Sequence, residues 1–219
     1  MKIASVVCRL LCLIGTVSLL SACQSTYYSA MEQVGVHKRD ILVDRVDNAK
    51  ESQQEAQEQF KSALDQYRAV VSFNGGEIET LYERLNAEYE DSEAAAEDVR
   101  ERIEKVEHVA EALFDEWKEE LNLYTSTRLR RQSERQLNET QSRYKSLIRA
   151  MKRAEARMQP VLAALQDNVL FLKHNLNARA IGALKDELAG IRQDVDVMIR
   201  EMSVAIQESD RFIADMKQE

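Results

Sequence analysis

The segment Leu188–Met216, LAGIRQDVDVMIREMSVAIQESDRFIADM, contains the clearest indication of the fold in this 219-residue chain. Apolar or small residues recur in it at alternating intervals of three and four, at Leu188, Ile191, Val195, Met198, Met202, Ala205, Ser209, Phe212 and Met216. This heptad spacing places one apolar seam along a helix, as in coiled coils and antiparallel bundles. Ile199, Ile206 and Ile213 widen the seam, so we expect this helix to contact two neighbouring helices.

Three earlier segments repeat the pattern. Their seams run through Leu42, Val46, Ala49, Gln53, Ala56, Phe60, Ala63, Tyr67 and Val70; through Val99, Ile103, Val106, Ala110, Leu113 and Trp117; and through Leu137, Thr140, Tyr144, Leu147, Met151, Ala154 and Met158. Helix-forming residues dominate, and Pro160 is the only proline. The sequence therefore predicts an all-α protein, in which long antiparallel helices form a coiled-coil-like up-down helical bundle.

Three turns divide the helices. Asn74-Gly75-Gly76 contains residues that tolerate positive φ, and Thr125-Ser126-Thr127 offers Ser126 as a helix cap. At His174-Asn175-Leu176-Asn177 the heptad phase slips, and a continuous helix through this site is the alternative to a turn.

Turns at all three sites predict four helices of about 45 residues. Their expected ranges are 28–73, 77–124, 127–173 and 178–217, with an interruption at Val34-Gly35-Val36 and a modest kink at Pro160.

The N-terminus has the pattern of a lipoprotein signal. Lys2 and Arg9 precede a short apolar segment that ends in Leu20-Ser21-Ala22-Cys23, and a thiol directly after small residues is the group that accepts a diacylglycerol. We expect cleavage of residues 1–22, lipidation of Cys23, a short tether over 23–30 and a single elongated bundle domain over 31–219. Gln24, in place of an aspartate, favours the periplasmic face of the outer membrane.

Charge is distributed in opposed blocks. Glu77–Tyr124 carries 17 acidic and 5 basic residues, whereas Thr125–Pro160 carries 10 basic and 3 acidic residues. Antiparallel pairing of these blocks would favour their docking, as charges beside a coiled-coil seam do. We expect this pairing to neutralise most of the charge of a basic cluster. A contact with anionic headgroups or with another envelope polymer at the hairpin tip is the alternative. The cluster comprises Arg128, Arg130, Arg131 and Arg135.

No motif for catalysis or cofactor binding occurs in the sequence. It has no Gly-rich phosphate loop and no Gly-x-Ser-x-Gly elbow. The Glu-x-x-His motif of di-iron bundles is absent too, since Lys105 precedes His108 and Phe171 precedes His174 by three residues. Once residues 1–22 are removed, Cys23 is the only cysteine. We therefore expect no enzymatic activity, no cofactor and no metal.

His174, Asn175 and Asn177 are polar residues within the most apolar part of the chain. One interpretation is a capped turn in which the two asparagines satisfy backbone groups. The alternatives are a buried polar layer that sets the register between helices and a surface that docks a partner.

The run Phe171–Ile181, FLKHNLNARAI, resembles the hallmark of the bacterial domain-of-unknown-function family 2959. Leu129-Arg130 resembles an upstream part of the same pattern, together with Ser133, Leu137, Thr140 and Tyr144. The resemblance covers most of the chain after the signal. It implies a predicted helical lipoprotein and transfers no active site.

Taken together, these features predict a non-enzymatic scaffold or adaptor of the cell envelope. Its expected partners are the membrane, through the lipid anchor, and an envelope protein or a second copy of the chain. We expect no nucleic acid and no small-molecule substrate, because the chain has a net charge of −8 and no nucleotide loop. The alternative function is a BAR-like or amphipathic bundle that binds and shapes the membrane surface.

Overall fold

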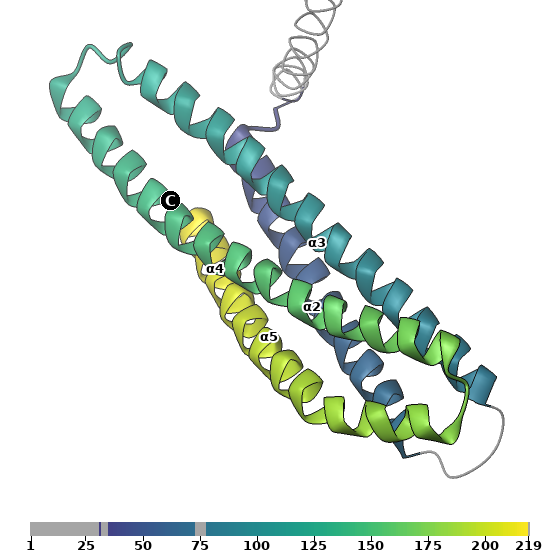
Figure 1. Cartoon of the computed structure of the whole chain (residues 1–219). Helices are drawn as coiled ribbons and strands as arrows, with labels where there is room; N and C mark the ends of the chain where they lie inside the picture. Colours follow the sequence, from purple (N-terminus) through teal and green to yellow (C-terminus); the bar gives the residue numbers. More distant parts are fainter. Residues whose placement is uncertain (1–30, 32–34, 73–77, 219) are drawn as a thin grey trace, which may run out of the picture.

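The structure is a computed structural model that describes residue 31 and residues 35–72 and 78–218. It contains α2 (Lys38–Val71), α3 (Ile78–Glu120), α4 (Thr127–His174) and α5 (Ala178–Gln218). Each helix packs against the next, and α5 returns to α2 (Figure 1). The described residues thus form the expected all-α, up-down-up-down helical bundle.

The predicted seams form the core of the bundle. All nine seam positions of α2, from Leu42 to Val70, have zero exposure. On α5, only Leu188 is half-buried, and the other eight seam positions are buried. The expected second contact of α5 is also present, because α5 packs against both α4 and α2.

The turn at 174–177 is confirmed. α4 ends at His174, and α5 begins at Ala178. The continuous-helix alternative is therefore wrong at this site. Ser126 caps α4 as predicted, since its side-chain oxygen accepts a hydrogen bond from the N–H of Leu129 at 3.4 Å. The predicted Asn74-Gly75-Gly76 turn lies outside the described residues, as do the signal segment 1–22, Cys23 and the tether 23–30.

The prediction of four nearly equal helices is wrong for α2, which has 34 residues against 43 in α3 and 48 in α4. The expected interruption near Val34–Val36 accounts for the difference. Gly35 has φ +83°, a left-handed conformation that favours glycine, and α2 starts only at Lys38. α3 also ends at Glu120 rather than Tyr124, in a tightened turn where the N–H of Leu123 donates to the carbonyl of Glu120.

The α3–α4 hairpin projects beyond the end of α5, and by a shorter length beyond the start of α2, where Lys38 pairs with Glu116. Arg143 of α4 pairs with Asp215, near the end of α5. The part of α4 from Thr127 to Arg143 is about 24 Å long at 1.5 Å per residue. Figure 1 shows this part of α4 running past the end of α5.

One core side chain lacks partners. Gln53 on α2 has zero exposure, and neither its amide nitrogen nor its amide oxygen has a hydrogen-bond partner within the described chain. A buried amide without partners carries an uncompensated desolvation cost.

We therefore predict that Gln53→Leu raises the free energy of unfolding, by about 1–2 kcal/mol, because it removes this buried amide at similar volume. Urea denaturation measures the change. Gln57→Leu is the matched control: Gln57, one turn further along α2, donates to the Ile199 carbonyl and to Ser203. The control should be neutral or destabilising, and equal gains in both variants would contradict the prediction.

Candidate interaction surfaces

The described residues contain no metal site. No group of three or more histidine, cysteine, aspartate or glutamate side chains in this part of the chain could hold a metal ion. His37, His108 and His174 are all exposed. Within the same residues, no helix is both long and apolar enough to cross a membrane.

The asparagines of the α4–α5 turn satisfy backbone groups. The side-chain oxygen of Asn177 accepts hydrogen bonds from the N–H groups of Arg179 and Ala180 at 3.0 and 3.3 Å, which caps α5. The side-chain nitrogen of Asn175 donates to the Phe171 carbonyl at 2.9 Å, and His174 is exposed. The three residues thus form the capped turn, and their assignment to a buried polar layer is wrong.

A buried polar contact does exist about two helical turns deeper in the bundle. The hydroxyl of Tyr67 on α2 lies 2.9 Å from the side-chain oxygen of Asn168 on α4 and 2.9 Å from the Leu184 carbonyl on α5, and it shares its proton between them. Asn168 also donates to the Ala164 carbonyl at 2.7 Å. This contact joins three helices, so it fixes their register where the turn residues do not.

Sequence reasoning missed Asn168. Tyr67 was on a predicted seam, but Asn168 lies outside every predicted seam, in front of the apolar run that starts at Val169. The available signal was the position of this amide directly before an apolar run. A side chain there is expected to be buried, and a buried amide requires hydrogen-bond partners.

Beside this contact lies an apolar surface at the α4–α5 end of the bundle. Leu170, Phe171 and Leu176 are exposed by 48%, 43% and 44%. Phe171 also lines an open groove of about 470 Å³ between α4 and α5, which Asp167 and Glu187 border. We call the three exposed side chains and this groove the α4–α5 end surface. It combines exposed apolar side chains with acidic groups at the border of the groove.

The four arginines lie at the opposite end of the molecule. All are exposed, and none forms an ion pair within the described residues: Arg128, Arg130, Arg131 and Arg135. The expected neutralisation by ion pairs is therefore wrong for this cluster.

The opposed charge blocks do form ion pairs further along the hairpin. Arg100 pairs with Glu155 at 3.2 Å, and Lys152 pairs with Glu107 at 2.5 Å. Both pairs lie well behind the turn between α3 and α4, so they leave the charges at the turn itself unmatched.

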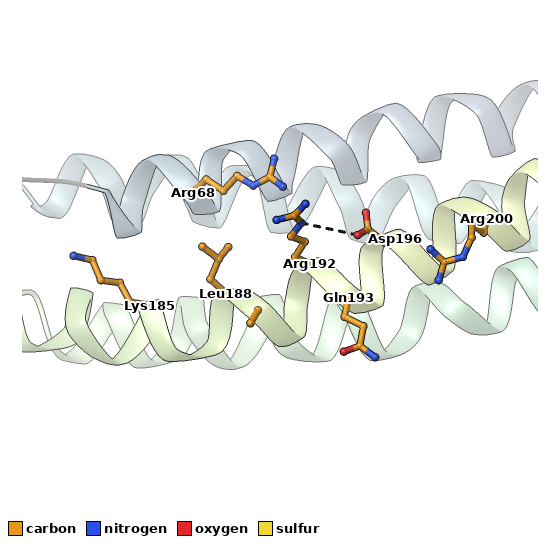
Figure 2. Close-up of a pocket in the computed structure, with 8 residues that line it drawn as sticks. Arg68, Lys185, Leu188, Arg192, Gln193, Asp196 and Arg200 are labelled. Carbon is orange, nitrogen blue, oxygen red and sulfur yellow. Dashed lines mark ion pairs between the residues drawn. The ribbon is translucent and has the colours of Figure 1, made fainter.

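A third surface is the groove between α2 and α5 in Figure 2. Arg68, Lys185, Arg192 and Arg200 line this groove of about 580 Å³, with Asp196 as its acidic member. Arg192 lies 4.0 Å from Asp196, and Arg68 pairs with Asp65 at 2.7 Å. Such exposed ion pairs contribute little to the free energy of folding. With four basic residues and one acidic residue, the groove has a net positive charge.

The geometry defines the class of this protein: an elongated, antiparallel four-helix bundle with distinct surfaces at its two ends. The family model described as "Protein of unknown function (DUF2959)" matches residues 27–216. The chain therefore belongs to this family, which confirms the resemblance seen in its sequence. Neither a curated protein nor a solved structure matches the chain.

Two tyrosines make stability sensitive to alkaline pH. Burial raises the pKa of Tyr67 far above its ordinary value of 10.0, and Glu187 adds to the shift. Burial, with the nearby charges of Glu107 and Glu111, raises the pKa of Tyr144 to about 12. Tyr144 packs edge-on against Phe114, with ring centroids 5.4 Å apart.

We predict that the free energy of unfolding falls as the pH rises above about 10, because unfolded tyrosines then lose protons that the folded chain retains. The contribution of the Tyr144 pKa shift to the free energy of unfolding is fully present below pH 10 and is lost between about pH 10 and 12. Urea titrations over this range should give a flatter decline for Tyr144→Phe than for the unmodified chain. A parallel decline would contradict the assignment.

The cap on α5 gives another test. Asn177→Ala should lower the free energy of unfolding by about 1 kcal/mol, because two backbone N–H groups lose their acceptor. Thermal unfolding followed by circular dichroism measures the loss. His174→Ala, at an exposed neighbouring position, serves as the control and should remain close to the unmodified chain.

Proposed function

We propose that this protein is a non-enzymatic scaffold of the cell envelope, anchored through Cys23 to the periplasmic face of the outer membrane. The lipobox Leu20–Cys23 and the following Gln24 support the anchor and its location. Two acyl chains bury enough methylene groups to hold a protein stably at a membrane.

The observation that carries the proposal is the separation of the two ends of the bundle. Lys38, at the start of α2, pairs with Glu116 near the end of α3 at 2.9 Å. The α4–α5 end surface lies at the other end, where Tyr67 of α2 approaches Leu184. α4 alone is about 70 Å long, so an anchor at the start of the chain could present this surface far from the membrane.

The partner that we propose for the α4–α5 end surface is an envelope protein, with a second copy of the chain as the alternative. Exposed apolar side chains beside a groove are typical of protein interfaces. The bundle acts by geometry: rigid helices hold one surface at a fixed distance from the anchor. A bundle that binds the membrane surface is the second candidate, and the unmatched arginines at the α3–α4 turn favour it.

In-cell photocrosslinking tests the scaffold. A photoreactive residue replaces Asn175, beside the α4–α5 end surface, and a second probe replaces Arg130 at the opposite end. A control probe replaces Glu55, which is exposed on α2. We expect the probe at position 175 to capture a defined envelope protein. Phe171→Asp should abolish this capture, and the control probe should not capture the same protein. Adducts confined to the chain itself and to lipid would refute the adaptor function.

The anchor has its own test. Cys23→Ser should abolish incorporation of a labelled fatty acid and release the chain from the membrane fraction, because serine offers no thiol for the diacylglycerol. Incorporation that persists in this variant would show that the lipid is attached elsewhere. The bundle should keep its helical circular dichroism, since its four helices begin at Lys38 and later residues.

A further inference from the structure

The exposed end of the α3–α4 hairpin has a composition unlike the rest of the surface. We define the α3–α4 tip as residues 121–135. Its exposed apolar side chains are Leu123, Tyr124 and Leu129, with exposures of 79%, 41% and 43%. No described element covers them, because α2 and α5 both end short of this part of the hairpin.

The hairpin beneath the tip is held in a defined register. The indole nitrogen of Trp117 donates to the hydroxyl of Ser133 at 2.8 Å, and Leu121 is buried next to the turn. The seam of α4 runs from Leu137 through Ser133, and the next position in its phase is Arg130, which is exposed. A charged residue thus occupies the place where a longer bundle would require an apolar one.

The charge of the tip is positive. Residues 121–135 contain the arginine cluster Arg128, Arg130, Arg131 and Arg135, and Glu134 is their one acidic residue. None of the four arginines has an ion-pair partner within the described residues. Glu119 and Glu120 are exposed in the last turn of α3, directly before the tip in sequence.

The combination of groups at the tip distinguishes between occupants. Three exposed apolar side chains lie on the same hairpin end as four arginines, whereas the exposed apolar groups at the other end of the bundle border a groove with acidic residues, which repel phosphates. A bilayer accepts the combination at the tip, because a few apolar side chains can enter the interface while arginines bind the phosphates. Tyrosine is also enriched at this depth of a membrane.

The position of the tip agrees with a bilayer. The described chain starts at Met31, and Val36 donates to the Met31 carbonyl at the end of the bundle where α2 begins. This is the end from which the tip projects. If Cys23 is the lipid anchor, the segment from Cys23 to Met31 spans at most about 28 Å, which is long enough to pass the part of the hairpin that extends beyond the Lys38–Glu116 pair.

We propose that the α3–α4 tip is a second membrane contact, in which Leu123, Tyr124 and Leu129 enter the interface of an anionic bilayer and the arginine cluster binds its phosphate groups. The orientation of the tip toward the anchoring membrane rests on the proposed lipid anchor, but the affinity of the tip for lipid does not. The bundle would then stand on two contacts, and its α4–α5 end surface would point away from the membrane.

Quenching by brominated lipids tests this contact in the full chain purified from membranes. Leu123→Trp places a reporter at the tip, and Leu176→Trp places one at the opposite end, with the signal of the native Trp117 subtracted. Each protein is reconstituted with vesicles of brominated phosphatidylcholine that contain about 30% phosphatidylglycerol or none. We expect strong quenching of the tip reporter in anionic vesicles and none at position 176.

Charge reversal provides the matched comparison. Each basic side chain strengthens binding to an anionic surface by about fivefold, so Arg128→Glu/Arg130→Glu/Arg131→Glu should remove most of the quenching. Lys185→Glu/Arg192→Glu/Arg200→Glu changes the net charge equally in the groove of Figure 2, and it should leave the quenching intact.

Flotation of the same vesicles reports the anchor separately. A chain that floats with the vesicles while the tip reporter stays unquenched keeps its anchor and overturns the tip contact. Equal quenching at positions 123 and 176 also overturns it, because the bundle would then lie flat. A chain that neither floats nor shows quenching overturns both proposals, whereas quenching in the Cys23→Ser variant supports the tip contact without the anchor.

Discussion

The structure depends on the burial of one stripe of side chains along α2, which packs against both α3 and α5. The described residues contain no cysteine, so burial, with a few hydrogen bonds and ion pairs between helices, holds the four helices together without a disulfide. Ala49, Ala56 and Ala63 recur every seven residues in this stripe with zero exposure, and their small side chains permit close approach of the neighbouring helices. Gln53 interrupts the stripe at its own free-energy cost.

The short length of α2 connects the fold to its candidate surfaces. Because Gly35 delays the start of α2 and α5 ends near the level of Arg143, α3 and α4 continue alone. Their seam stops at Ser133, and exposed arginines take over from apolar residues. At the other end all four helices are present, and Tyr67 ties three of them together beside an apolar groove. The two ends therefore differ in chemistry because they differ in how many helices enclose them.

Periodicity predicted most of the fold, because heptad spacing is a local property that burial enforces directly. The seams of all four helices, the cap at Ser126 and the turn before Ala178 follow from it. The contact between Tyr67 and Asn168 does not follow from periodicity. It depends on how α2 and α4 are rotated against each other, and the two residues are 101 positions apart in sequence. The four arginines were identified from the sequence, but their favoured neutralisation was wrong for a related reason: block charges show which helices pair, but not which side chains meet.

The order of contacts along the chain has a consequence for how the bundle assembles. α2 pairs with α3 and α4 with α5 across connections of a few residues, whereas α5 reaches α2 through contacts such as Gln57 with Ile199, 142 residues apart. Closing short loops costs little conformational entropy, so the two hairpins can form before the ring is complete. The contacts between α5 and α2 close the ring last in this order, and they complete the single core that all four helices share.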